Sequence, residues 1–170
     1  MRFTLIDRIT ALEPGKRIEA VKNLTMAEEY LAEHFPGFPV LPGVLMLEAV
    51  TQAGAWLVRA TEDFRHSVII LKEAKAVKYG HFVTPGKQLR LNCEWAGENG
   101  SLVTLKAKGE LSGASSVSCR VVLERFNLED RHLGYAEQDK RLKEWHKQLF
   151  ERLTHPDLRK KVTAAALGGL

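Results

Sequence analysis

Residues Gly43 to Ala60 read GVLMLEAVTQAGAWLVRA, a stretch without the alternation of apolar and polar residues that marks much of this chain. It is rich in helix-forming residues and is long enough for about five helical turns. Pro42-Gly43 favours a helix start, and Thr61-Glu62-Asp63 favours a stop. Apolar residues fall on every side, and a helix that is apolar all round is buried. The stretch therefore predicts a long central helix.

Segments on either side of this helix alternate between apolar and polar residues, which is the pattern of half-buried β-strands. The clearest are residues 88–95, 103–111 and 117–124, and the weaker candidates are 17–24, 67–71 and 75–79. Short turns separate the clear segments, and they force neighbouring strands to run antiparallel, because a parallel return needs about a dozen residues. We therefore expect an α+β fold, in which an antiparallel sheet wraps around the central helix.

The chain changes character after Phe126. Leu142, Trp145 and Leu149 recur at helical spacing, which predicts an amphipathic helix over Gln138 to Leu153. We expect this apolar face to pack on its own domain or on a neighbouring subunit. The chain is thus predicted to divide into a core domain, residues 1–126, and a helical C-terminal extension, residues 127–170.

Composition argues against several classes of protein. The two cysteines, Cys93 and Cys119, are too few for a disulfide framework or a Cys-rich zinc site, so we expect buried thiols. Met1 to Pro14 lacks the apolar core of a signal peptide, and no stretch reaches the ~18 apolar residues of a membrane span. We therefore expect a cytoplasmic protein. The net charge of +4 comes from interleaved basic and acidic residues, which argues against nucleic-acid binding.

The predicted central helix contains a single acidic residue, Glu48. Burial in an apolar helix favours the neutral, protonated form of a carboxyl group. Gln52 follows one turn later on the same face, where its amide is placed to hold that carboxyl group by a hydrogen bond. The alternative is a glutamate that points into a subunit interface or out to water.

The loop that precedes the helix is conformationally restricted. His34 to Gly43 reads HFPGFPVLPG, with three prolines and two glycines in ten residues. It holds His34 at one end and leads into a helix N-terminus at Gly43, where unpaired N–H groups and a partial positive charge are available. A titratable imidazole, a buried carboxyl group and a backbone donor therefore lie close in sequence. The other five histidines are expected at the solvated surface: His66, His81, His132, His146 and His155.

The segment His34 to Gly54, HFPGFPVLPGVLMLEAVTQAG, resembles the signature of the 3-hydroxyacyl-acyl carrier protein dehydratases of bacterial type II fatty acid synthesis. The resemblance extends upstream through Leu5 to Thr25 and weakly downstream to Phe126. It implies a hot-dog fold and the dehydration of 3-hydroxyacyl thioesters to trans-2-enoyl thioesters on acyl carrier protein. It implies no cofactor and no metal.

Carried over position by position, the resemblance implies that His34 is the catalytic histidine and Glu48 the catalytic acid. It places the thioester carbonyl on the backbone N–H of Gly43 and gives Gln52 the role of orienting the acid. Glutamate rather than aspartate at the acid position favours the branch that dehydrates without isomerising. The acyl chain is expected to lie in an apolar tunnel lined by residues such as Phe35, Val40, Leu41 and Val44.

The resemblance also implies a homodimer, in which the histidine and the acid of one site come from different subunits, and this dimer can assemble further as a trimer of dimers. A basic patch at the tunnel mouth, drawn from Lys75, Lys78 or Arg59, would suit an acidic carrier protein.

The sequence departs from the family at Glu33, where glycine usually precedes the histidine. Two alternatives therefore stay open beside the dehydratase of fatty acid synthesis. One keeps the fold but serves a specialised lipid pathway or hydrolyses thioesters. The other is a non-catalytic subunit that binds acyl groups or dimerises.

Overall fold

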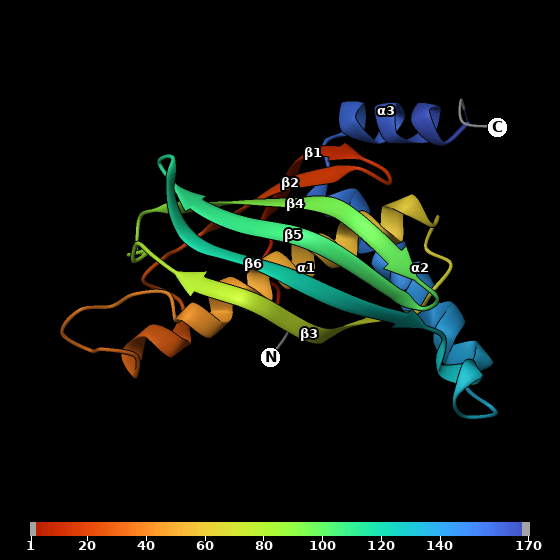
Figure 1. The fold of residues 1–170 in the computed structure, drawn as a ribbon, viewed down its shortest axis with the longest axis horizontal. Helices are drawn as coiled ribbons and strands as arrows, with labels where there is room; N and C mark the ends of the chain where they lie inside the picture. Colours follow the sequence, from red (N-terminus) through yellow and green to blue (C-terminus); the bar gives the residue numbers. More distant parts are fainter. Residues whose placement is uncertain (1–2, 168–170) are drawn as a thin grey trace.

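The computed structural model describes residues 3–167, with side chains described through residue 160 and at Val162. Six strands form one antiparallel sheet in the order β1-β2-β4-β5-β6-β3 (Figure 1). Their bounds are β1 Arg8–Glu13, β2 Arg17–Asn23, β3 Val68–Tyr79, β4 Gln88–Asn99, β5 Leu102–Leu111 and β6 Ala114–Phe126. The helices are η1 Glu29–Ala32, α1 Gly43–Thr61, η2 Leu128–Asp130, α2 Ala136–Leu153 and α3 Pro156–Leu167.

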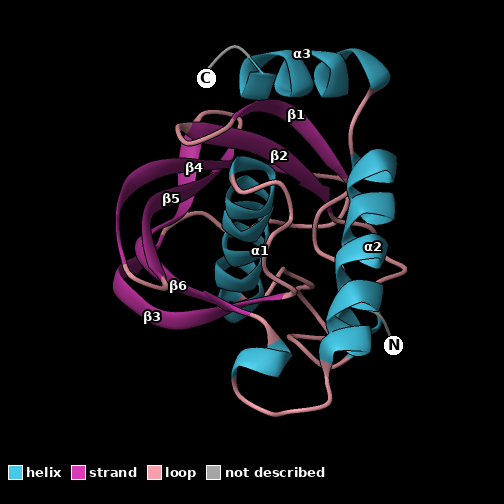
Figure 2. Cartoon of the chain, turned by 90° about the vertical axis from the view of Figure 1, so that its right-hand side faces the viewer, coloured by secondary structure: helices cyan, strands magenta, loops and turns pink. Residues whose placement is uncertain are grey.

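Helix α1 lies in the concave face of the curved sheet (Figure 2). This is the hot-dog arrangement, so the expected α+β class and the central helix are confirmed. The three clear strands are also confirmed as β4, β5 and β6. The two weaker candidates at 67–71 and 75–79 are parts of a single strand, β3, whose pairing with β6 shifts register between Lys75 and Lys78.

The sheet lies close to α1 at Gly54. A Cβ atom at this position would lie 2.6 Å from Leu105 Cδ1 on β5, so a larger residue there would require the Leu105 side chain to shift. Around it, Val50, Ala53 and Leu57 of α1 are completely buried. Cys93 is buried in the same layer and donates a hydrogen bond from its Sγ to the carbonyl of Val50, whereas Cys119 is only partly buried.

Helix α2 covers the side of α1 that faces away from the sheet (Figure 2). Phe150 of α2 packs against Trp56 and Phe64, with ring centroids 6.0 and 5.5 Å apart. The buried face of α2 consists of Asp139, His146, Phe150 and Leu153. The buried face of α2 is therefore rotated about the helix axis relative to the predicted one. Leu149 contacts the core, but Trp145 is 37% exposed. His146 is only 9% exposed, so its predicted place at the solvated surface is wrong.

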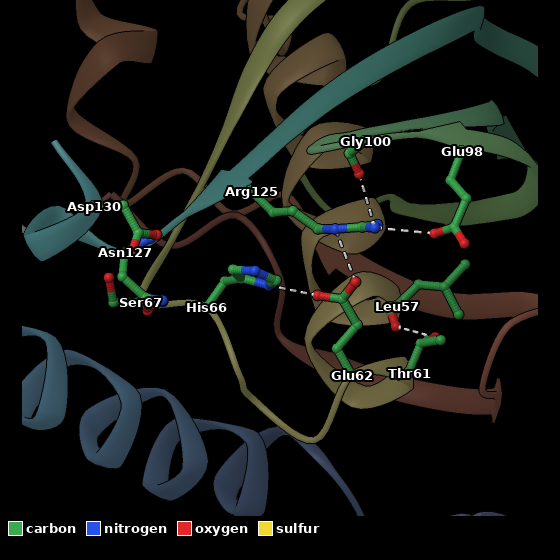
Figure 3. A network of polar contacts seen from close by, with 10 residues as sticks. All are labelled: Leu57, Thr61, Glu62, His66, Ser67, Glu98, Gly100, Arg125, Asn127 and Asp130. Carbon is green, nitrogen blue, oxygen red and sulfur yellow. Dashed lines mark hydrogen bonds and ion pairs between the residues drawn. The ribbon is translucent and has the colours of Figure 1, made fainter.

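Polar contacts hold the start of the extension to the end of the sheet (Figure 3). Glu62, just after α1, accepts hydrogen bonds from Arg125 Nε at 2.9 Å and from His66 Nδ1 at 2.7 Å. Asp139 of α2 accepts hydrogen bonds from the Ser67 hydroxyl and from the backbone N–H groups of Leu128 and Glu129, the first two residues of η2. Burial alone would raise the pKa of Asp139, but these donors together with the charge of Lys143 lower it.

The two edges of the sheet differ. Strand β1 is covered by the C-terminal segment, because Ile9 forms a parallel bridge with Thr154 and α3 packs beside it. Strand β3 pairs only with β6, so in the described part of the chain its other edge has no partner strand. Ile70 and Tyr79 of β3 are 41% and 50% exposed. A strand edge without a partner is a surface on which a further strand can add.

Candidate active site

The loop before α1 fixes the side chain of His34. The backbone N–H of His34 donates to the carbonyl of Tyr30 in η1 over 3.1 Å, and its Nδ1 lies 3.2 Å from the carbonyl oxygen of Val40. A carbonyl oxygen only accepts, so this contact places a proton on Nδ1 of the neutral imidazole. Nε2 is then left with its lone pair available, which is the form that a general base requires.

The backbone of this loop is strained next to the histidine. Phe35 has a φ of 56°, in the left-handed region that costs a side-chain-bearing residue about 1–2 kcal/mol. The strained turn closes with a hydrogen bond from Phe38 N–H to Phe35 O over 2.7 Å, and the Phe35 ring lies 4.4 Å from the imidazole. Strain kept beside a titratable group is typical of functional loops.

Gly43, the first residue of α1, is required by a close neighbour. A Cβ atom there would lie 3.1 Å from the ring of Tyr79 on β3. The first N–H groups of a helix have no partner within the helix, so the N–H of Gly43 is available to a ligand. It lies at the positive end of the α1 dipole, which favours a group that carries or develops negative charge.

Glu48 is half-buried on α1 and is held by Gln52. The Gln52 amide donates from Nε2 to Glu48 Oε1 over 2.9 Å and to the carbonyl of Phe3 over 3.0 Å, and its Oε1 accepts from Leu5 N–H at 2.9 Å. Both N–H bonds of the amide and its oxygen are therefore in use. The N-terminal segment thus fixes Gln52, and Gln52 in turn fixes the predicted acid.

His34 and Glu48 do not meet within one chain. Among the residues that the structure describes, no hydrogen bond or ion pair joins them, since His34 contacts Val40 and Glu48 contacts Gln52. Glu33 is exposed beside His34.

The predicted tunnel residues fall into two pairs. Phe35 and Val44 are 56% and 67% exposed, so they are open to a ligand or to another subunit. Val40 and Leu41 are each 1% exposed and are buried in the chain's own core. The lining role of all four residues stays a prediction.

A pocket of about 340 Å³ runs from Glu48 along α1 to α2. Its α1 side includes Glu48, Gln52, Trp56 and Arg59, and residues of α2 also line it: Trp145, His146 and Leu149. The sequence pattern indicated that α2 packs on something but not that it lines a pocket. The spacing of Trp56 and Arg59, eight and eleven residues after Glu48, is the signal that could have placed them on the same face.

Arg59 is the site residue whose predicted place is wrong. It was expected at a basic surface patch, but it is only 9% exposed. Lys75 and Lys78 do lie at the surface, where they line a hollow on the sheet together with Lys106, Lys108 and Arg120. In the part of the chain that is described, no cluster of potential metal ligands occurs, and none of the helices is both long and apolar enough to cross a membrane.

Comparisons with known proteins show which chains this one resembles. A family model described as a FabA-like domain matches residues 1–121. A protein of Symbiobacterium thermophilum named 3-hydroxyacyl-[acyl-carrier-protein] dehydratase FabZ is 46% identical over 92 residues, which cover 54% of this chain and 65% of that protein. A protein of the same name from Clostridium novyi is 35% identical over 120 residues, which cover 71% of this chain and 84% of that protein. The match thus spans just under two thirds of the first of these curated relatives.

Solved structures show the same fold at low sequence identity. The dehydratase heterocomplex ApeI:P from Xenorhabdus doucetiae superposes with a TM-score of 0.60 at 15% identity, covering 74% of this chain and 84% of that chain. The protein smu.793 from Streptococcus mutans, solved bound to acetyl CoA, superposes with a TM-score of 0.57 at 10% identity. The superposition covers 75% of this chain and 94% of that chain. Because the family model matches most of the chain, from residue 1 to residue 121 within β6, the chain belongs to the FabA-like domain family.

Proposed function

We propose that this protein dehydrates 3-hydroxyacyl-acyl carrier protein thioesters to trans-2-enoyl thioesters in fatty acid biosynthesis. The observation that carries the proposal is the carboxyl group of Glu48, placed on the central helix and locked there by Gln52. The FabZ relatives, which are dehydratases of this kind by name, support the same reaction.

The proposed reaction is an elimination. The thioester carbonyl accepts a hydrogen bond from Gly43 N–H at the start of α1, which stabilises negative charge as the α-proton leaves. Nε2 of His34 takes that proton as the C–H bond breaks. The electron pair forms the new double bond, the C–O bond at carbon 3 breaks, and Glu48 donates its proton to the departing hydroxyl group, so that water leaves. Proton exchange with solvent then resets His34 and Glu48.

The proposed site needs two subunits. His34 and Glu48 have separate partners in one chain, Val44 beside Glu48 is 67% exposed, and the edge of β3 lacks a partner strand in the described residues. A second copy that pairs through β3 would cover these apolar groups and bring one subunit's histidine towards the other's acid. Further assembly as a trimer of dimers and a cytoplasmic location remain part of the proposal.

An acidic acyl carrier protein is the proposed partner. The hollow on the sheet gathers five cationic side chains and Glu94, and Glu73 and Glu110 pair with only two of the cations, Lys75 and Lys108. Such a surface attracts a negatively charged protein and speeds its encounter.

The deciding experiment uses 3-hydroxyacyl thioesters on carrier protein and follows formation of the enoyl product. We expect Glu48→Gln and His34→Ala each to lower kcat by about 10²–10⁴-fold, because each removes a proton-transfer group. Glu33→Gln, which changes an exposed carboxylate beside His34, serves as the matched control and should retain activity. Release of free thiol without enoyl product would assign a thioesterase instead. Tight binding without turnover would assign a non-catalytic subunit.

A further inference from the structure

At the far end of the α1/α2 pocket lies a buried cation, the guanidinium of Arg59, which forms no ion pair with any carboxylate of the described residues. Arg59 is 9% exposed and lines the pocket, and its Nε makes no hydrogen bond within the described residues. Its guanidinium lies 5.2 Å from the ring centroid of Trp56, which offers a face but no charge. Burial lowers the pKa of Arg59 to about 10, so the group stays charged at neutral pH. A buried charge that is unpaired is costly, and this arrangement is stabilised when an anion binds.

The neighbouring residues do not supply that anion. His146 lies across the pocket and carries no negative charge, and burial together with the charge of Arg59 lowers its pKa to about 4, so it is neutral at pH 7. Asp139 of α2 is already occupied by the Ser67 hydroxyl and by the backbone N–H groups of Leu128 and Glu129. Among the described pocket residues, Glu48 is the only carboxylate, and it lies at the opposite end.

The distance between Glu48 and Arg59 suits one extended ligand. Glu48 and Arg59 are eleven residues apart on the same helix, which separates their Cα atoms by about 16 Å. Between them the wall is mostly apolar, with Ala55, Trp56, Ile69 and Leu71 in the lining. A molecule whose reacting end lies at Glu48 therefore presents its far end to Arg59 across an apolar wall.

We propose that this protein accepts acyl chains that end in a carboxylate, and that Arg59 binds that terminal carboxylate at the far end of the pocket. The inference rests on the proposed function, since it places the reacting end of the chain at Glu48. Arg59 would then determine specificity, because a guanidinium binds a carboxylate through paired hydrogen bonds, whereas a methyl end would leave the buried cation unpaired.

The test compares two 3-hydroxyacyl thioesters of equal chain length, one ending in a methyl group and one in a carboxylate. For the wild-type protein we expect a higher kcat/KM for the carboxylate-ended chain. Arg59→Met, which keeps an apolar side chain in place, should lower kcat/KM for that substrate by about ten- to a hundredfold and leave the methyl-ended one unchanged or improved. Arg152→Met removes an exposed cation from α2 and is the matched control.

A binding measurement separates failure of this inference from failure of the proposed reaction. Saturated acyl pantetheine thioesters lack the 3-hydroxyl group, so they can be titrated calorimetrically without chemistry. Stronger binding of the carboxylate-ended thioester that disappears in Arg59→Met supports the site even if no dehydration occurs. Equal binding and equal kcat/KM for both chain ends would overturn it while leaving the dehydratase intact. Should Arg59→Met fail to fold, the preference of the wild-type protein for one of the two chain ends decides alone. If phosphate binds at Arg59 but the carboxylate-ended thioester does not compete with it, Arg59 is only a site for free anions, which also overturns the proposal.

Discussion

The two halves of helix α1 are built differently. From Ala49 onward most of its side chains are buried, because the sheet covers one side and α2 covers the other. In the first six residues only Met46 is buried, and Val44 is 67% exposed. Both halves are apolar in sequence, so hydrophobicity does not explain the contrast. The second half is covered by this chain's own extension, whereas the first half remains open.

This difference separates the well-packed part of the helix from the part that carries the residues of the proposed reaction. The open half carries Gly43 and Glu48, and the loop with His34 leads directly into it. The covered half carries Gly54, which lies close to the sheet, and the completely buried Leu57. An apolar surface that a chain leaves exposed is typical of a site where another molecule binds. We expect that molecule to be a second subunit together with the substrate.

The strongest test of this contrast mixes two inactive variants, His34→Ala and Glu48→Gln. If each site takes its histidine and its acid from different subunits, a mixed dimer contains one intact site. Random reassociation makes half of the dimers mixed, so activity should return from near zero to about a quarter of the wild-type value.

The measurement is dehydration activity after partial unfolding and refolding of the mixture, with each variant treated alone as the control. No recovery in the mixture, although light scattering shows dimers, would place both groups of a site in the same chain. The contrast between the two halves of α1 would then need another explanation.

A matched pair of truncations tests the two halves directly. Leu57→Ala removes a completely buried side chain and should lower the free energy of unfolding by about 2–5 kcal/mol. Val44→Ala removes a mostly exposed one and should change the stability of the single chain by less than about 0.5 kcal/mol. Urea unfolding at low protein concentration measures both. Equal losses would mean that the two halves are covered alike.

The architecture was predictable because its signals are local. The break in alternation at Gly43 to Ala60 gave α1 to within one residue at its C-terminal end, and the clear alternation in 88–95 marked β4. Gln52 was predicted correctly as a partner of Glu48, because residues four apart on a helix always lie on one face.

Features that depend on long-range packing were not predictable in this way. His146 and Arg59 look like surface residues, since an isolated histidine or arginine carries no local mark of burial. Their burial follows from where α2 lies on α1. The spacing of apolar residues in α2 predicts only approximately which face of the helix is buried. The N-terminal contacts of Gln52 with Phe3 and Leu5 were missed for the same reason, since they join residues 49 and 47 positions apart.

The covered half also predicts a pH dependence of stability. Burial and the charge of Arg59 lower the pKa of His146 from 6.5 to about 4 in the folded protein. The unfolded chain therefore binds the extra proton first as pH falls, so stability is lost between about pH 6.5 and pH 4 and levels off below. The loss attributable to His146 should be about 2–3 kcal/mol between pH 7 and pH 4.5.

Urea titrations of the wild-type protein and of His146→Leu should show this loss only in the former, because carboxylates contribute to both proteins and cancel in the difference. His132→Leu changes an exposed histidine and should behave as the wild type. If the free energy of unfolding changes with pH to the same extent in all three proteins, His146 is not held neutral by burial.

The smallest expected effect lies where the two halves of α1 meet, at Gln52. Its amide joins Glu48 to the N-terminal segment, so it acts by positioning the acid. Gln52→Leu keeps the size of the side chain and should lower kcat by roughly tenfold with little change in KM, because misplacing a proton donor weakens the transition state more than binding. The pH at which kcat is half-maximal should also move, since the carboxyl group loses a hydrogen-bond donor. Gln138→Leu, on the exposed face of α2, is the control. If Gln52→Leu lowers the melting temperature but leaves the pH–rate profile unchanged, the role of Gln52 is structural only.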